Sequence, residues 1–346
     1  SWNIEMKSKI WSRITWILWV LLIIALPITT FPLVMKLTRT SSVAPASLLF
    51  LLPLVIFALP GIVRTKSPLP VHAKPVLLFF VYALITILLA FLRPISDYKE
   101  QSLTGAAVEG AATLILGLLF YFVSVSVPNT PGKINSTLRI VNWTGMVVVC
   151  WSILQMVVQP FLPNVFLFFE QIQAFFSPNR ILQDRMLGFA AEPSWLAHML
   201  NLVFLAYWLA ASFTGSSVHK WRFRKITFEN ILLVMGVIVV VGTLSRGGLL
   251  AFMLVIFLIF ILLNSKLIKW VVNRFPGGKR ILLTTGVSLV LIIAYLGLLL
   301  AGLWGLSKVD PRMETVFEFS KGEPNALMEY AADLQFGERV VYWQTG

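Results

Sequence analysis

The feature that most constrains this chain is a succession of long apolar runs separated by short polar segments. A helix needs about 20 apolar residues to cross the hydrocarbon core of a bilayer. Runs of about that length occupy residues 15–35, 43–63, 75–92, 104–127, 139–160, 191–213, 229–244, 247–263 and 281–305. Charged residues make up only 12% of the chain, which is too few to cover a protein of this size in water. The sequence therefore predicts an all-α polytopic integral membrane protein with about nine transmembrane helices.

The apolar runs end before the last part of the chain, where acidic residues become frequent. We expect residues 1–305 to form a transmembrane helical bundle and residues 306–346 to begin a large extracytoplasmic loop. Within that loop, residues 325–343 have the pattern of an amphipathic helix. The first residue is not Met and the last, Gly346, falls within a motif, so we expect the chain to be a fragment of a longer protein.

The apolar stretch 231–263 is too long for one crossing, because a helix of that length would reach about 50 Å. It is interrupted by Ser245-Arg246-Gly247-Gly248. An unpaired Arg in lipid costs at least ~2.5 kcal/mol, and glycines readily supply turn conformations. We therefore predict two short helices with Arg246 at the tip of the hairpin between them.

The net charge of +13 does not indicate a nucleic-acid partner, because the basic residues fall in short loops and form no basic stripe. The positive-inside rule instead uses such residues to orient membrane helices. With a cytoplasmic N-terminus, most Lys and Arg fall on the cytoplasmic face, including the basic segments 214–228 and 264–280. Of the acidic residues, only Glu5 and Glu229 then fall on the cytoplasmic side.

Charged side chains within predicted spans indicate a functional site by default. The expected topology brings several of them toward the extracytoplasmic ends of their helices. They are Glu109, Glu192 and Arg246, with Arg180 and Arg185 shortly before Glu192 and His198 deeper in the same helix. This convergence predicts an extracytoplasmic site.

Each of these residues also fits a structural role, and these alternatives stay open. Glu192 precedes Pro193 and suits the first turn of a helix, where an acid complements the dipole. The aliphatic part of the Arg246 side chain can lie in the membrane while its charged group reaches the lipid headgroups. Glu109 fits a buried partner of an Arg, His198 fits a hydrogen-bonded structural residue, and Arg180 and Arg185 fit ordinary loop charges.

Several chemistries lack their sequence motifs. The chain has no phosphate loop of the Walker type, no Gly-x-Ser-x-Gly elbow, and no His or Cys spacing typical of a metal site. We therefore expect no metal and no cofactor. An anionic substrate would be held by arginines, whose planar guanidinium groups suit phosphate oxygens.

Three segments resemble the O-antigen polymerase and O-antigen ligase family, and together they cover roughly residues 180–346. The family's Ser-Arg-Gly signature is similar to Gly242-Thr243-Leu244-Ser245-Arg246-Gly247-Gly248. The Glu-Pro-Ser segment of its polysaccharide polymerase branch is similar to Arg185-Met186-Leu187-Gly188-Phe189-Ala190-Ala191-Glu192-Pro193-Ser194. The Arg-x-x-x-Trp element of its large outer loop is similar to Glu338-Arg339-Val340-Val341-Tyr342-Trp343.

The resemblance implies a helical, metal-independent glycosyltransferase in the bacterial inner membrane. Its substrates would be glycans on undecaprenyl pyrophosphate, polymerised outside the cytoplasm into O-antigen, capsule or exopolysaccharide. The pyrophosphate would be held by Arg246, Arg185 and Arg339, with Arg180 nearby. These groups would stabilise the negative charge that develops as the pyrophosphate leaves. Glu192 would be the base for the acceptor hydroxyl, supported by Glu109 and His198. Membrane lipid, a flippase and a chain-length regulator are the expected partners.

The chain departs from the ligase branch, which carries a functional His in its large outer loop, because residues 306–346 contain no His. The Glu-Pro-Ser segment likewise favours a polymerase. Three alternatives remain: transfer of a glycan to a lipid or protein acceptor by a ligase, a secondary transporter or flippase, and a non-catalytic membrane scaffold. Transporters usually place charges near the midplane, often within two related halves, and no repeat is visible here.

Overall fold

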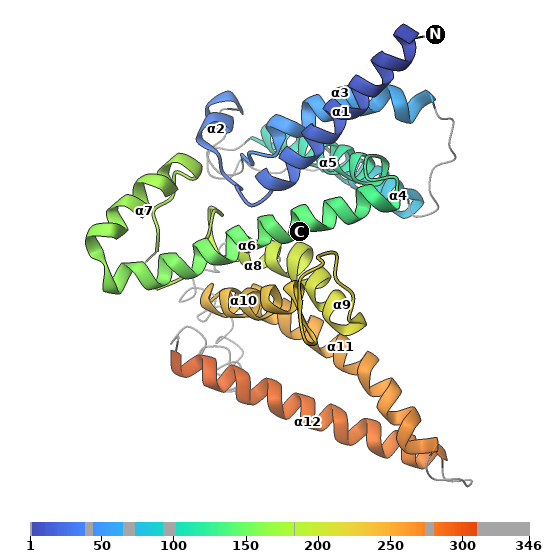
Figure 1. Cartoon of the computed structure of the whole chain (residues 1–346), viewed down its shortest axis with the longest axis vertical. Helices are drawn as coiled ribbons and strands as arrows, with labels where there is room; N and C mark the ends of the chain where they lie inside the picture. Colours follow the sequence, from blue (N-terminus) through green and yellow to red (C-terminus); the bar gives the residue numbers. More distant parts are fainter. Residues whose placement is uncertain are drawn as a thin grey trace. The chain divides into compact units, whose positions relative to one another are not determined.

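The computed structural model describes residues 2–38, 44–64, 73–92, 102–182, 184–273 and 280–309, which are helical apart from turns, loops and one short hairpin (Figure 1). The helices are α1 (Trp2–Ala25), α2 (Pro32–Thr38), α3 (Leu48–Arg64), α4 (Ala73–Ala90), α5 (Leu103–Ser126), α6 (Pro131–Phe161), α7 (Pro163–Phe176), α8 (Pro193–Met199), the π-helical segment η1 (Leu200–Leu205), α9 (Ala206–Thr214), α10 (Phe228–Gly242), α11 (Arg246–Asn273) and α12 (Arg280–Val309). Strands β1 (Arg222–Phe223) and β2 (Ile226–Thr227) form the hairpin.

Five helices in the described part of the chain are long and apolar enough to cross a membrane. They span Ala73–Ala90, Leu103–Ser126, Pro131–Val158, Pro193–Thr214 and Thr284–Gly302. Shorter apolar helices occupy Ile10–Ala25, Leu48–Ala58, Val165–Phe176, Phe228–Gly242 and Arg246–Ile259. The protein is thus a helical membrane-embedded protein, as predicted, while the count of nine crossings and their orientation stay predictions.

The first predicted span, 15–35, differs from the structure, because α1 ends at Ala25 and α2 begins at Pro32. Pro27 explains this break: a proline disfavours helical backbone at the residue before it. The chain turns there, with the Ile28 N–H donating to the carbonyl of Ala25 at 3.1 Å. Pro32 then suits the first position of a new helix.

Other helix bounds also differ from the predicted ones. α6 starts at Pro131 rather than 139, because the Thr130 side chain accepts the Lys133 N–H and caps the helix. α11 continues to Asn273, past the expected end at 263. α12 runs through the predicted boundary at 305 to Val309. The rest of the expected loop, including the amphipathic stretch 325–343, lies outside the described residues.

The predicted division of the stretch 231–263 is present, but the turn lies earlier than expected. α10 ends at Gly242, and Leu244 adopts the left-handed backbone with φ 47°. The Ser245 hydroxyl accepts the Gly248 N–H at 3.3 Å, as an N-cap does, and Arg246 begins α11. Gly247 and Gly248 are helical, so the turn does not use their conformational freedom.

The described helices belong to two compact units, residues 1–243 and 244–346. In the second unit α11 and α12 pack together, and the Tyr295 hydroxyl donates to the carbonyl of Met253 at 2.7 Å. In the first unit one apolar core joins α1, α3 and α5 through buried Trp19, Leu22, Leu54 and Val123.

A second packing centre of the first unit is the buried indole of Trp208 on α9. A Cβ atom added at Gly145 of α6 would lie 2.5 Å from this ring, and one at Gly236 of α10 would lie 2.7 Å from it. The two glycines therefore let α6 and α10 close around a large side chain, as small residues do in membrane bundles.

Hydrogen bonds to α6 show which segments lie at each end of the first unit. α1 lies beside α6, with Trp19 Nε1 donating to Thr137 Oγ1 at 3.0 Å. Arg139, close to Thr137, contacts the segment between α9 and α10, whereas Gln155 contacts the segment between α7 and α8. At 1.5 Å per residue, Arg139 and Gln155 lie about 24 Å apart on α6. These two segments are therefore at opposite ends of the unit.

Candidate functional site

The segment 177–192, between α7 and α8, carries three of the predicted site residues and is tied to several surrounding elements. Its deepest attachment is Gln155 on α6, which is only 2% exposed. Gln155 Nε2 donates to the Gly188 carbonyl at 3.2 Å, and its Oε1 accepts the Gly188 N–H at 3.0 Å. Nε2 also reaches Gln173 Oε1 on α7 at 3.2 Å. The amide thus links two helices and the segment.

Gly188 is required at this point for two reasons. Its φ of +60° lies in the left-handed region, which favours glycine. A Cβ atom there would also lie 2.9 Å from the Ser152 hydroxyl of α6. The segment can therefore approach α6 closely only with glycine at this position.

Aromatic stacking holds the next residue, Phe189. The indole of Trp151 lies between Phe169 of α7 and Phe189, with ring centroids 4.8 and 5.4 Å apart and nearly parallel planes. Trp151 Nε1 donates to Gln173 Oε1 at 3.1 Å, so the polar edge of the indole has a partner. Because Phe169 lies on α7, this stacking packs both α7 and the segment against α6.

Both ends of the segment have further anchors. Asn179 Nδ2 donates to the Ala191 carbonyl at 2.6 Å, and the Ala191 N–H donates to Thr29 Oγ1 after α1 at 2.8 Å. The Met186 N–H donates to the Gly242 carbonyl at 2.9 Å, and Arg185 Nε donates to the Thr243 carbonyl at 2.9 Å. The segment is therefore fixed to the region after α1, to α6 and α7, and to the end of α10.

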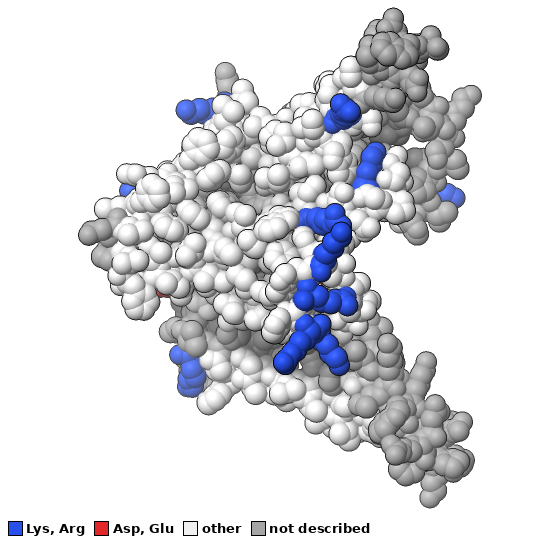
Figure 2. Space-filling model, in the orientation of Figure 1, with Lys and Arg blue, Asp and Glu red and all other residues white. Residues whose placement is uncertain are grey.

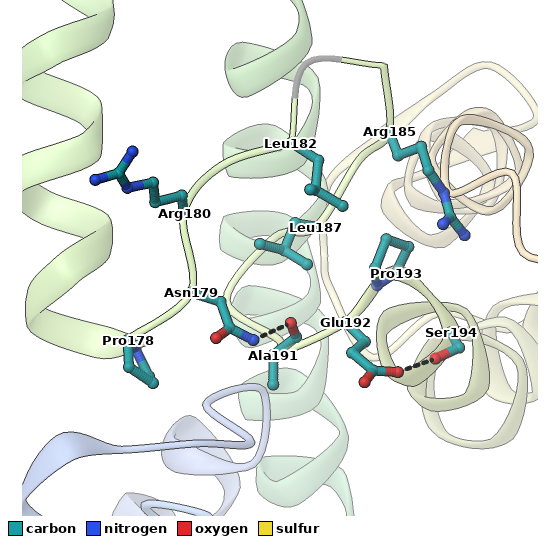
Figure 3. A pocket seen from close by; sticks show the side chains of 10 residues that line it. All are labelled: Pro178, Asn179, Arg180, Leu182, Arg185, Leu187, Ala191, Glu192, Pro193 and Ser194. Carbon is teal, nitrogen blue, oxygen red and sulfur yellow. Dashed lines mark hydrogen bonds between the residues drawn. The ribbon is translucent and has the colours of Figure 1, made fainter. Parts of the chain in front are cut away.

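A cavity of about 490 Å³ lies on this segment (Figure 3). It is lined by Pro178, Asn179, Arg180, Leu182, Arg185, Leu187, Ala191, Glu192, Pro193 and Ser194. The structure thus brings Arg180, Arg185 and Glu192, three of the expected site residues, to one pocket. Figure 3 shows the three charged groups spread around its rim rather than pointing toward one another.

Glu192 stands immediately before α8 in extended backbone and is exposed. Its side chain makes no capping hydrogen bond to the helix backbone. Instead, Glu192 Oε2 accepts a hydrogen bond from the Ser194 hydroxyl at 3.0 Å. The carboxylate is therefore available to a ligand in the pocket, although its position would also suit the helix dipole.

The two arginines of the pocket differ. Arg180 is exposed, whereas Arg185 is partly buried and its Nε donates a hydrogen bond to the Thr243 carbonyl. Guanidinium groups donate charge-assisted hydrogen bonds to anions, and such bonds are the strong ones. A pocket with two cations, one carboxylate and apolar walls can bind an amphipathic anion and accept a proton at Glu192.

Of the other predicted site residues, Glu109 and His198 do not line this pocket. Glu109 is exposed on α5, and His198 is exposed on α8 beyond Ser194. Arg246 begins α11 in the second unit, and its expected place beside Arg185 stays a prediction. Arg339 lies outside the described residues. Within the described residues no group of three or more His, Cys, Asp or Glu side chains could hold a metal ion.

Sequence reasoning missed a buried polar network at the other end of the first unit. Glu229, predicted only as a cytoplasmic charge, is 0% exposed. Its Oε1 accepts hydrogen bonds from Asn142 Nδ2 at 3.0 Å and the Val218 N–H at 3.2 Å. Asn142 Oδ1 in turn accepts from Trp208 Nε1 at 2.8 Å. Polar residues within the apolar runs were the available signal.

Neither protein-family models, nor curated proteins, nor solved structures gave a match to this chain. The function proposed below therefore rests on the residues of the pocket and on the sequence motifs.

Proposed function

We propose that this protein is a membrane glycosyltransferase that polymerises oligosaccharide repeat units carried on undecaprenyl pyrophosphate. The observation that carries the proposal is the pocket on segment 177–192, where Arg180, Arg185 and Glu192 share one cavity. The sequence motif around Glu192 resembles the polymerase branch of the O-antigen family, and it forms this cavity. The products would be O-antigen, capsule or exopolysaccharide.

The charges of the pocket suit the two chemical needs of the reaction. Arg180 and Arg185 would bind the pyrophosphate of the donor and stabilise the negative charge that develops as it leaves. Glu192 would accept the proton of the attacking hydroxyl of the acceptor glycan, which then bonds to the anomeric carbon as the carbon–oxygen bond to pyrophosphate breaks. Neither role needs a sugar nucleotide or ATP.

The fixed backbone of the segment supports this assignment. Catalytic groups must be held in place before the substrate binds, since misplacement loses much of the rate. Gln155, Thr29 and Gly242 hold the segment from three sides, while the Glu192 and Arg180 side chains stay exposed. The apolar residues Leu182, Leu187 and Pro193 line the same cavity and suit the lipid part of the carrier.

The proposal includes a location. With the N-terminus in the cytoplasm, the positive-inside rule puts the basic segment 214–228 inside and the pocket outside. This fits the structure of the first unit, in which those two segments lie at opposite ends of α6. We propose the bacterial inner membrane, with the pocket facing outward, where a flippase would deliver the lipid-linked units and a chain-length regulator would act.

The experiment is a profile of lipid-linked and finished glycans in cells that lack the gene, complemented with wild type or Arg180→Gln. Loss of long polymer, with single repeats still reaching the final acceptor, is the result expected of a polymerase. Polymer accumulating on the carrier would identify a ligase instead. An unchanged profile in the deleted strain would overturn the glycosyltransferase assignment.

The matched control is Lys36→Gln, which removes an exposed basic charge from α2 and leaves the pocket intact. We expect it to restore wild-type polymer, whereas Arg180→Gln restores little. Equal complementation by the two variants at equal protein levels would remove Arg180 from the site.

A further inference from the structure

The hairpin between α9 and α10 presents a second surface, whose chemistry the proposed function does not use. β1 pairs with β2 in antiparallel register, with Arg222 opposite Thr227 and Phe223 opposite Ile226. Arg224 lies in the turn with a φ of 55°. The hairpin belongs to the end of the first unit opposite the pocket, where Arg139 Nε donates to the Val218 carbonyl at 2.8 Å.

The base of this hairpin is rigidly held. The buried Glu229 carboxylate accepts the Val218 N–H at 3.2 Å, and Arg222 Nη2 donates to the Gly215 carbonyl at 2.8 Å. The His219 ring meets Phe228 edge-on, with centroids 4.7 Å apart. Thr227 and Asn230 cap α10 reciprocally. The side chains beyond this base are therefore presented by a fixed scaffold.

Those side chains alternate between apolar and basic. Trp221 is 52% exposed, Phe223 60% and Ile226 47%. The exposed basic residues between and beside them are Lys220, Arg222, Arg224 and Lys225. Figure 2 shows Lys and Arg side chains gathered along one edge of the molecule. The single acidic residue in the stretch 215–230, Glu229, is buried and adds no negative charge to the surface.

The position of the hairpin decides what it contacts. It joins two apolar helices, α9 and α10, and so lies where they leave the hydrocarbon core. Aromatic side chains with a polar neighbourhood favour the headgroup region of a bilayer, and Lys and Arg there are attracted to anionic lipids. A soluble acidic partner would account for the charges but not for the exposed Trp221 and Phe223 beside membrane helices.

We propose that this hairpin binds the headgroups of anionic phospholipids. Trp221 and Phe223 insert at the level of the headgroups, and Lys220, Arg224 and Lys225 bind the phosphates. Arg222 instead stabilises the base of the hairpin, because its guanidinium donates a hydrogen bond to the Gly215 carbonyl. This inference stands independently of the proposed glycosyltransferase activity and of which leaflet the hairpin faces.

The test is native mass spectrometry of the purified full chain with phosphatidylglycerol or phosphatidylcholine. We expect phosphatidylglycerol to bind preferentially, and the double variant Lys220→Gln/Lys225→Gln to weaken its binding by roughly tenfold. The matched control, Lys36→Gln/Lys308→Gln, removes two other exposed lysines and should change binding less than twofold. A second variant, Trp221→Ala/Phe223→Ala, should weaken the binding of both phosphatidylglycerol and phosphatidylcholine.

Equal loss in the hairpin variant and the control would overturn the proposal, since the effect would then follow net charge alone. So would equal binding of both lipids by the wild type, or full displacement of phosphatidylglycerol by millimolar inorganic phosphate. Melting temperatures of the variants close to wild type establish that lost binding is not lost folding.

Discussion

The side-chain amide of Gln155 hydrogen-bonds in both directions with the backbone of Gly188, donating to its carbonyl at 3.2 Å and accepting its N–H at 3.0 Å. The side chain of a polar residue in an apolar helix thus supplies the two hydrogen bonds that the backbone of a neighbouring β-strand would otherwise supply. Buried backbone groups need such partners, because no water reaches them. The segment that carries Arg185 and Glu192 thus depends on a side chain 33 residues away in sequence from Gly188.

Gln155→Ala should destabilise the protein by about 2 kcal/mol, because it leaves the buried Gly188 N–H and carbonyl without these partners. The measurement is the melting temperature of the purified protein in detergent. Gln171→Ala is the control, since Gln171 is an exposed glutamine on the neighbouring helix α7. A melting temperature for Gln155→Ala equal to that of the control would refute the anchoring role.

Gly188→Ala and Gly215→Ala form a matched pair, since both glycines have φ near +60°. Each alanine should cost about 1 kcal/mol for its left-handed backbone. At Gly188 the added Cβ also meets the Ser152 hydroxyl at 2.9 Å, whereas at Gly215 nothing lies within 4 Å. Chemical or thermal unfolding should therefore show Gly188→Ala as clearly the less stable variant. Equal stabilities would mean that α6 and the segment are not in close contact.

Gly236→Ala should destabilise the packing around Trp208, because its Cβ would lie 2.7 Å from the indole ring of a buried side chain. Overpacking of this kind costs about 1–3 kcal/mol. The control is Gly117→Ala on α5, where nothing lies within 4 Å and alanine should be neutral or slightly stabilising. Thermal unfolding of the two variants in the same detergent compares them directly, and a stable Gly236→Ala protein would contradict this packing.

His219 gives the segment between α9 and α10 a dependence on pH. Burial lowers the pKa of His219 below its ordinary value of 6.5; the Glu229 carboxylate opposes this shift and the Arg139 guanidinium adds to it. The unfolded chain therefore takes up this proton at a higher pH than the folded protein. The contribution to stability is complete above pH 6.5 and is lost as pH falls below that value.

The measurement is the change in melting temperature between pH 7.5 and pH 5.5. We expect His219→Phe, which keeps an aromatic ring but does not titrate, to lose less stability on acidification than wild type. Gln171→Ala, which removes no titratable group, is the control, and its pH dependence should match that of wild type. If His219→Phe shows the full wild-type loss, then His219 is not the group responsible.

The sequence was a good guide to the helices because membrane spans depend on one local property, a long apolar run. It was a poorer guide to their ends. Pro27 breaks the predicted helix 15–35, and Leu244, not a glycine, takes the left-handed conformation in the turn after α10. A leucine in that conformation has no sequence signal, since it depends on the packing around it.

The site was predictable in part. Arg180, Arg185 and Glu192 lie close together in the chain, so one segment could bring them to one pocket. The anchors of that segment were not predictable, because Thr29 and Ala191 are 162 residues apart in sequence. Asn142 and Glu229, 87 residues apart, likewise meet only after the helices pack. The π-helical segment η1 also had no local signal, although such segments are frequent at functional sites.

The most direct test of the central claim is the rate of chain extension by purified protein, with lipid-linked repeat units extracted from the deleted strain as substrate. Glu192→Gln is compared with Asp184→Asn, which neutralises an exposed acid on the same segment that does not line the pocket. Removing a general base typically costs about 10²–10⁴ in rate. We predict a loss of that size for Glu192→Gln and a rate within about twofold of wild type for Asp184→Asn. Equal rates for the two variants would contradict the account.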